Sequence, residues 1–144
     1  MKILITGITG LIGNHLMHVL LKNEIKNIKG TYHSSRDLEE YITKNIEIVK
    51  AVHTAARVID FGTKQQFYEA HLEATHYLLK DALLHNVEHF IYVSSVGVAS
   101  GINRNKIIPN ETTPLVKTGI HYDDAKIDTE KLVIDFCTKN DIKY

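Results

Sequence analysis

The sequence has little of several features that mark particular classes of protein. Its single cysteine, Cys137, allows no disulfide within the chain, which favours a reducing compartment. Basic and acidic side chains number 17 each, so the net charge gives no reason to expect nucleic acid or an anionic membrane as a partner. No apolar run approaches the roughly eighteen residues of a membrane-spanning helix. These absences predict a cytoplasmic protein with no nucleic-acid and no membrane partner.

Histidine is plentiful, with nine residues, but its spacing predicts no metal site. Two pairs, His15 with His18 and His85 with His89, have spacings at which one helix could supply two ligands. Neither pair has a third ligand at a suitable spacing. We therefore predict no metal, with the histidines solvated or packed in the core.

The 144 residues are enough for one domain with a substantial core, so we expect a single unit over residues 1–144. Helical and strand patterns alternate along the chain. The predicted strands are 2–6, 27–33 and 88–95, and the predicted helices are 11–22, 64–86 and 121–140. This alternation predicts an α/β fold, a Rossmann-like doubly wound parallel sheet whose ligands bind at the carboxyl ends of the strands.

The turn TGITGLIG, residues 6–13, joins the first strand to the first helix and contains Gly7, Gly10 and Gly13. In this context the first glycine permits a tight turn, the second lets a diphosphate approach the backbone, and the third allows close packing of helix and strand. The helix N-terminus offers free N–H groups to the anion. The turn therefore predicts nucleotide binding, and the alternative is a purely structural turn.

The residues about 20 positions beyond the turn bear on the choice of dinucleotide. An acid there accepts the ribose hydroxyls of NAD, whereas a basic group accommodates the 2′-phosphate of NADP. The chain has His33, Ser34, Ser35 and Arg36 in this region, with no acid before Asp37. We predict NADP as the preferred cofactor over NAD. The alternative is that Arg36 is an ordinary solvated charge.

A serine, a tyrosine and a lysine further along the chain suggest catalysis. Ser94 and Ser95 end the strand EHFIYVSS, so at least one of their hydroxyls is expected at the crevice beyond the strand ends. Tyr122 and Lys126 are four residues apart at the start of a helix and share a face. A tyrosine with a pKa near 10 needs a nearby positive charge to act at neutral pH, which Lys126 can supply. A serine hydroxyl can hold the substrate oxygen.

With these motifs the chain resembles the extended short-chain dehydrogenase/reductases, within the family of NAD-dependent epimerases and dehydratases. The matching segments are TGITGLIG, VHTAA at 52–56, VEHFIYVSS at 87–95, ETTP at 111–114, and YDDAK with Glu130. The runs ARVIDFG and FYEAHLEATHYLL look most like the branch of dihydroflavonol reductases and hydroxysteroid dehydrogenases.

The resemblance implies roles for individual residues. The backbone of Gly7, Gly10, Leu11 and Ile12 would contact the diphosphate, while Thr54, Ala55 and Ala56 would line the adenosine and nicotinamide side. Ser95 would orient the substrate oxygen, Tyr122 would transfer the proton, and Lys126 would bind the ribose and tune the tyrosine. The reaction implied is hydride transfer to or from a carbonyl or alcohol carbon of a small-molecule substrate. The helices 64–86 and 121–140 would support a homodimer.

The chain also lacks parts that the family has. In NIEIVKAVHTAA, residues 45–56, Lys50 meets Ala51 directly, as if a turn and a helix between two strands had been deleted. We therefore predict one strand here, a strand order of 2-1-4-5 in the family's terms, and a weakened cofactor site without the usual adenine contact. The C-terminal substrate domain is also missing, and His71 replaces a common asparagine. The alternatives to an enzyme are a cofactor-binding sensor or scaffold, an inactive remnant, or a portion of a longer enzyme.

Overall fold

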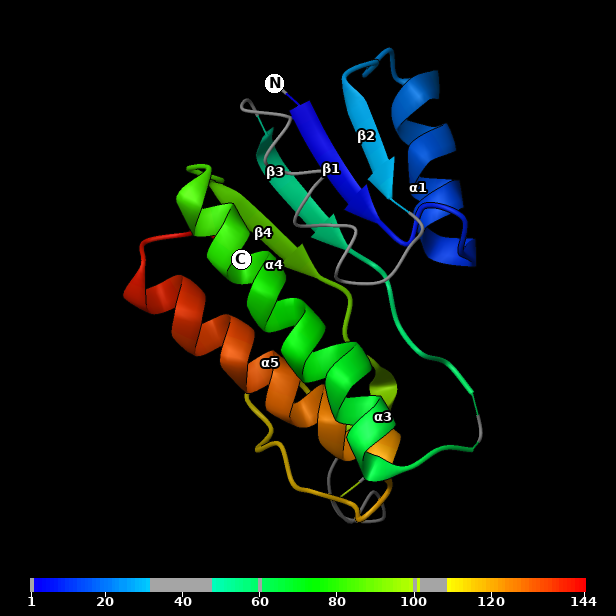
Figure 1. The fold of residues 1–144 in the computed structure, drawn as a ribbon, viewed down its shortest axis with the longest axis vertical. Coiled ribbons are helices and arrows are strands. Elements are labelled where there is room, and N and C mark those ends of the chain that lie inside the picture. Colours follow the sequence, from blue (N-terminus) through cyan, green and yellow to red (C-terminus); the bar gives the residue numbers. More distant parts are fainter. Residues whose placement is uncertain (1, 32–47, 60, 100, 102–108) are drawn as a thin grey trace.

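The computed structural model describes residues 2–31, 48–59, 61–99, 101 and 109–144, and its centre is a parallel sheet. Four strands pair in the order β2-β1-β3-β4 (Figure 1). Their bounds are Lys2–Thr6 (β1), Ile28–Thr31 (β2), Ile48–His53 (β3) and His89–Tyr92 (β4). All three neighbouring pairs are parallel, so the carboxyl ends of the strands meet at one edge of the sheet.

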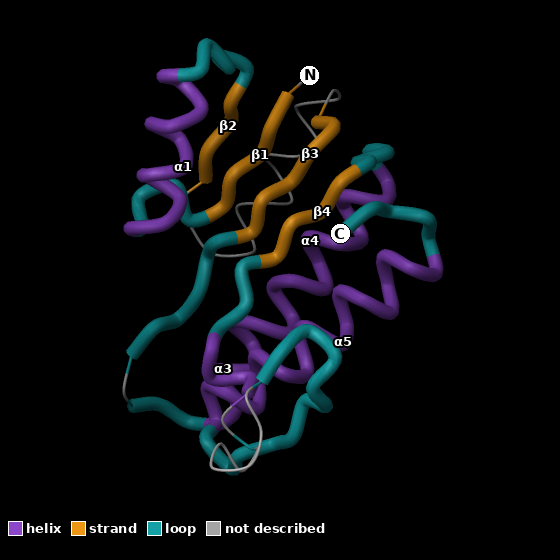
Figure 2. Tube along the Cα trace, turned by 180° about the vertical axis from the view of Figure 1, so that it is seen from behind, coloured by secondary structure: helices purple, strands orange, loops and turns teal. Residues whose placement is uncertain are grey.

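Helices cover both faces of this sheet, as Figure 2 shows from behind. Helix α1 spans Leu11–Lys22 and packs on one face. On the other face lie α4 (Ala74–Leu84) and α5 (His121–Lys139), which run side by side. Two shorter elements, α3 (Lys64–Tyr68) and the π-helical turn η1 (Glu69–Glu73), continue directly into α4, and a 3₁₀ turn, η2 (Val96–Ala99), follows β4.

The alternation of side chains along β1 explains the two layers. Successive residues of a strand point to opposite faces. Ile3 and Ile5 belong to the core under α1, whereas Leu4 between them belongs to the core under α4 and α5. Because Ile3, Leu4 and Ile5 are all apolar, both faces of the strand must be buried, and a layer of helices packs on each face. The predicted doubly wound parallel sheet is confirmed.

The predicted strand order is also confirmed. The strand β3 lies directly beside β1, and among the described residues no strand lies outside β2. β3 runs without interruption through the junction of Lys50 and Ala51, so this part of NIEIVKAVHTAA is one strand. Residues 45–47 of that prediction lie outside the described residues. Near the C-terminus, Lys143 forms a parallel bridge with His89, in agreement with a strand beginning there.

Two large apolar side chains of these elements are exposed. Leu83 is exposed because the buried stripe of α4 runs through Leu78, Leu79 and Ala82. Ile91 in β4 is also exposed. It points away from the face on which Phe90 packs under α4 and α5.

Within the described ranges, no helix is both long enough and apolar enough to cross a membrane.

The core under α4 gives a direct test of the fold. Leu79 is 0% exposed and Leu21, on α1, is 46% exposed. We expect Leu79→Ala to lower the free energy of unfolding by about 2–5 kcal/mol, because it removes buried methyl groups and leaves a cavity. Leu21→Ala should change it by less than about 1 kcal/mol. Urea unfolding of both variants measures the difference, and equal losses would contradict this packing.

Candidate active site

A row of polar side chains lies at the carboxyl edge of the sheet. The register pairs Thr31 with Thr6, Thr6 with His53, and His53 with Tyr92, one residue from each strand. We call these four residues the polar row. The same register that aligns the apolar residues upstream therefore brings these groups together where ligands of parallel sheets bind.

His53 is the centre of the polar row. Its Nδ1 lies 2.6 Å from the Thr6 hydroxyl, and its Nε2 lies 3.0 Å from the hydroxyl of Thr75 on α4. Burial, followed by the charges of Lys126 and His71, lowers the pKa of His53 to about 3. The ring is therefore neutral at physiological pH. It links the glycine turn to α4 by hydrogen bonds, and both of its nitrogens are occupied.

The glycine turn lies against the end of β3. Gly7 has φ +70, a left-handed conformation that favours glycine, and a Cβ there would lie 2.8 Å from the Ala55 nitrogen. The Thr54 hydroxyl donates to the Thr6 carbonyl at 2.6 Å, and the Ala55 N–H donates to the Thr6 hydroxyl at 3.3 Å. The glycine turn therefore touches Thr54 and Ala55, which belong to the second predicted cofactor-binding segment. Position 7 has no room for a residue larger than glycine.

The start of α1 has the form of an anion site. A Cβ at Gly13 would collide with the Gly7 carbonyl, so helix and turn pack closely only with glycine there. Gly10 is the N-cap and provides no side-chain cap, and the first turn carries no acidic residue. The N-terminal N–H groups of the helix are thus free of side-chain acceptors, and Leu11 beside them is 90% exposed. This cradle fits a diphosphate of a dinucleotide.

Ser95 and Tyr122 line one cavity of about 830 Å³. The Ser95 hydroxyl accepts the Gly97 N–H at 3.1 Å, whereas the neighbouring Ser94 hydroxyl donates to the Glu130 carboxylate at 2.5 Å. Of the two serines that end the strand motif, Ser95 faces the cavity. The rest of the lining comes from Phe67, from His121 at the start of α5, and from two loops: Val58, Ile59, Phe61, Gly62, Gly119 and Ile120.

Lys126 is buried one helical turn beyond Tyr122. Its side chain is 2% exposed, its Nζ donates to the Val93 carbonyl at 3.0 Å, and Nζ lies 4.7 Å from the centre of the Tyr92 ring. Burial lowers its pKa to about 8, an effect that the Glu130 carboxylate partly offsets. A lysine with this pKa is charged at neutral pH and can exchange its proton at modest cost.

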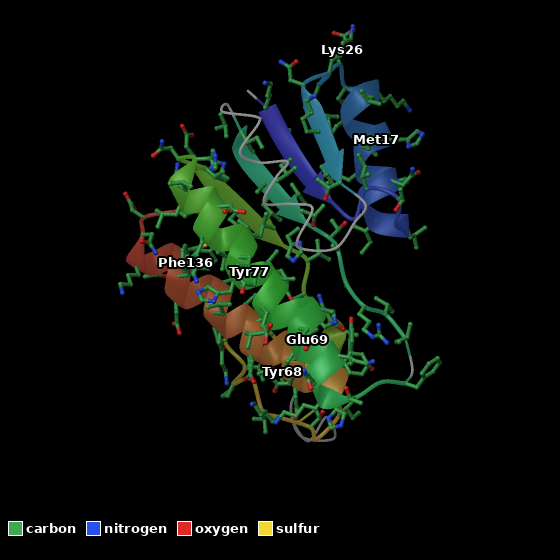
Figure 3. The ribbon with its side chains drawn as sticks, in the orientation of Figure 1. Met17, Lys26, Tyr68, Glu69, Tyr77 and Phe136 are labelled. Carbon is green, nitrogen blue, oxygen red and sulfur yellow. The ribbon has the colours of Figure 1, made fainter. Side chains whose placement is uncertain are left out.

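Hydrogen bonds at the start of α5 fix the loop before Tyr122. The Asp124 carboxylate accepts the N–H groups of Thr118 and Gly119 at 2.8 and 3.3 Å. The Asp128 carboxylate accepts from the Tyr68 hydroxyl at 2.8 Å and from Lys117 at 2.7 Å. Figure 3 labels Tyr68 near the end of the helical layer where α3 meets α5. Together these contacts join the loop, α3 and α5 around one end of the cavity.

The structure brings most of the predicted site residues to one edge of the sheet. The glycine turn lies against Thr54 and Ala55, and Ala56 follows them in the chain. Ser95, Tyr122 and Lys126 cluster around the C-terminal end of β4 and the start of α5. The two residues on which the NADP preference depends, His33 and Arg36, lie outside the described residues. Among the described residues, no group of three or more metal-ligating side chains occurs.

Sequence reasoning missed three groups of the site, two of them buried and Tyr92 half-buried. His53 and Tyr92 belong to the polar row, and Thr75 on α4 completes the hydrogen bonds of His53. Their position at strand ends was a usable signal for the first two, because the carboxyl ends of parallel strands converge. For Thr75 the sequence carried no such signal, since its role depends on how α4 packs on the sheet.

The parallel sheet, glycine turn and uncapped helix together define a dinucleotide-binding α/β domain. The chain belongs to the NAD dependent epimerase/dehydratase family, whose family model matches residues 3–144. A search of the curated proteins found no match.

Solved structures share the fold. The UDP-Glc/GlcNAc 4-epimerase of Campylobacter jejuni is 20% identical with a TM-score of 0.81, and the match covers 96% of this chain and 50% of that one. The UDP-glucose 4-epimerase of Thermotoga maritima is 23% identical (TM-score 0.83, covering 100% and 53%). A short-chain dehydrogenase/reductase superfamily protein of Agrobacterium tumefaciens, solved with bound NAD, is 21% identical (TM-score 0.84, 99% and 47%). The chain spans about half the length of these proteins.

The buried Lys126 predicts a specific pH dependence of stability. Its pKa is about 8 in the fold and 10.5 ordinarily, so between these values the unfolded chain binds more protons. The free energy of unfolding should then rise with pH from about 8 to 10.5, while below pH 8 the cost of burying the charge is fully present. Relative to Lys126→Met, the unmodified chain should gain more than about 1 kcal/mol across this interval.

Urea unfolding at several pH values measures this gain. Lys131→Met, at an exposed position of the same helix, controls for the loss of one positive charge. Stability curves that stay parallel for the unmodified chain and Lys126→Met would contradict the assigned burial.

Proposed function

We propose that the protein is an NAD(P)-dependent oxidoreductase of the epimerase/dehydratase type, with Ser95, Tyr122 and Lys126 as its catalytic residues. The observation that carries the proposal is the shared cavity of Ser95 and Tyr122, with the buried Lys126 one helical turn further along α5. Family membership and NAD-bound neighbours such as the Agrobacterium protein support cofactor-dependent chemistry.

The glycine turn and the end of β3 would hold the cofactor. Backbone N–H groups of Gly7, Gly10, Leu11, Ile12 and Gly13 would bind its diphosphate at the uncapped N-terminus of α1. Thr54, Ala55 and Ala56 would line its adenosine and nicotinamide side, and Tyr122 and Lys126 would contact the ribose. The bound nicotinamide supplies or accepts a hydride.

The catalytic residues would act on the substrate oxygen. The Ser95 hydroxyl, oriented by the Gly97 N–H, would hold a carbonyl or alcohol oxygen in the cavity. The Tyr122 hydroxyl would deliver a proton to that oxygen in reduction, or remove one in oxidation. The Lys126 ammonium would favour the tyrosinate electrostatically, because an opposite charge nearby stabilises the ionised phenol.

NADP remains our proposed preference over NAD, from Arg36 and the lack of an acid before Asp37. Three of the solved neighbours were determined with NAD, which supports dinucleotide binding in general. The second candidate function is a cofactor-binding sensor or scaffold without turnover. It is favoured by the uninterrupted β3, which leaves no acidic turn between Lys50 and Ala51 to contact the adenine.

Tyr122→Phe tests the catalytic assignment. The change removes one hydroxyl and keeps the ring, so we expect turnover to fall by about 10²–10⁴-fold. Cofactor affinity should fall far less, because Tyr122 would supply only one of the several proposed cofactor contacts. The assay follows reduced-cofactor absorbance with a panel of aryl and alkyl ketones and with UDP-glucose. Tyr144→Phe, at an exposed position, is the control. Full activity in Tyr122→Phe would refute the assignment, and binding without turnover in the unmodified chain would favour the sensor.

We also propose that the chain forms a homodimer through the outer faces of α4 and α5. Tyr77 and Leu84 are exposed two helical turns apart on α4, and Ile134 is exposed on α5. Light scattering should give twice the chain mass, and the double change Tyr77→Glu with Leu84→Glu should give the monomer. Leu21→Glu on α1 should leave the dimer intact, and a monomeric unmodified chain would refute the proposal.

A further inference from the structure

Lys126 carries a positive charge at a place that water hardly reaches. Its side chain is 2% exposed, and it forms no ion pair with any described residue. Glu130, one helical turn further along α5, is the expected partner, but its carboxylate accepts the Ser94 hydroxyl at 2.5 Å. Burial lowers the pKa of Lys126 to about 8, and Glu130 offsets this effect only in part. The ammonium is still charged at neutral pH, so contacts other than an ion pair must help to stabilise it.

Two consecutive residues, the last of β4 and the one after it, contact this ammonium. The Val93 carbonyl accepts from Nζ at 3.0 Å, and Nζ lies over the Tyr92 ring, 4.7 Å from its centre. A cation within about 6 Å of the centre of an aromatic ring is attracted by the negative potential of the ring face, and the attraction is stronger where water is excluded. The Tyr92 ring also packs against the core under α4 and α5. The end of β4 therefore presents a fixed aromatic face to the buried charge.

The hydroxyl of Tyr92 does not explain this contact. It is buried and has no hydrogen-bond partner among the described residues, and the nearby Thr129 hydroxyl donates instead to the Ala125 carbonyl at 2.7 Å. Burial raises the pKa of Tyr92, so the phenol is neutral and offers Lys126 no negative charge. A buried hydroxyl without a partner lowers stability. The part of Tyr92 that can favour the ammonium is thus its ring.

The groups around this pair leave the ring face to Lys126. The His53 ring packs on Tyr92 with centroids 5.8 Å apart, but burial lowers the pKa of His53 to about 3, so His53 is neutral. The remaining charged or titratable groups nearby are Glu130 and Tyr122 on α5, His71 on η1, and Arg57 in the loop after β3. His71 Nε2 and Arg57 Nε are buried without a hydrogen-bond partner among the described residues, so neither atom bonds to Lys126.

We propose that Tyr92 is a positioning residue of the site, whose ring face stabilises the charged Lys126 ammonium by a cation–π interaction and holds it against the Val93 carbonyl. Its role in turnover rests on the proposed function, whereas the interaction itself is a property of the free chain. The ammonium has three N–H donors, and one of them bonds to Val93. A carboxylate in place of the ring would bind the others, whereas a ring face leaves a donor for the proposed ribose contact.

The test varies the charge distribution of the ring and keeps its shape. Phenylalanine, difluorophenylalanine and pentafluorophenylalanine are placed in turn at position 92, and the Lys126 pKa is measured by NMR of ¹³C-labelled lysine side chains. The Lys126 resonance is assigned by its absence in Lys126→Met. Tyr92→Phe keeps the ring face, so the Lys126 pKa should stay close to about 8. Fluorine withdraws electron density from the face, so the pKa should fall stepwise, by about half a unit to one unit in the pentafluoro form.

Matched measurements separate this role from simple packing. Pentafluorophenylalanine at position 144, where Tyr144 is 62% exposed, should leave the Lys126 pKa unchanged. Tyr92→Phe removes a buried hydroxyl without a partner, so its thermal stability should equal or exceed that of the unmodified chain. If the ring serves only to pack, the Lys126 pKa will be the same in all three ring variants, and the proposal is overturned. Should the pentafluoro form fail to fold, the difluoro form provides the same comparison.

Cofactor titration of these samples keeps the two proposals apart. If the unmodified chain binds neither NADH nor NADPH, the proposed function fails, while the Lys126 titration still decides the role of Tyr92. If the cofactor binds and the Lys126 pKa does not depend on fluorination at position 92, the proposed function stands and the role of Tyr92 falls.

Discussion

The close contact between the glycine turn and the end of β3 is the constraint on which the rest of the structure depends. Gly7 lies so near the backbone of Ala55 that no side chain fits, and the Thr54 hydroxyl holds the Thr6 carbonyl. This contact fixes where α1 begins, and it aligns β1 and β3 so that Thr6 meets His53. His53 in turn forms a hydrogen bond with Thr75 and so links the sheet to α4. Helix α4 packs in the same core as α5, the helix that contains Tyr122 and Lys126.

The uninterrupted β3 shows how this arrangement survives a shortened connection. Lys50 and Ala51 lie in the middle of β3, paired with Ile3 and Leu4 of β1. A strand beside the centre of the sheet is buried on both faces, so its pairing is determined by apolar contacts rather than by the length of the preceding segment. The glycine turn contacts β3 at its end, around Thr54 and Ala55, and this contact is intact. Among the residues that the structure describes, no strand lies outside β2, and this edge of the sheet is away from the proposed catalytic residues.

Much of the fold could be predicted from the sequence because its signals are local. The apolar run of β1, the glycines after it and the periodicity of α5 each specify their own element. The exposure of Leu83 and Ile91 cannot be predicted in this way, because burial depends on which face a neighbouring element covers, and an apolar side chain alone does not reveal that. The same is true of the candidate site. Tyr122 and Lys126 were predicted from their spacing, and Ser95 from the end of its strand and the resemblance to the family. Thr75 and the unpartnered nitrogen of His71 depend on tertiary packing.

The most direct test of the central claim is a titration of the 144-residue chain with NADH and with NADPH, followed by the fluorescence of the reduced cofactor. The glycine turn, the uncapped start of α1 and the end of β3 predict saturable binding that Gly13→Ala reduces by at least about tenfold. Arg36, with no acid before Asp37, predicts stronger binding of NADPH. Absence of saturation at millimolar concentrations of either cofactor would contradict the claim that this shortened domain holds a dinucleotide.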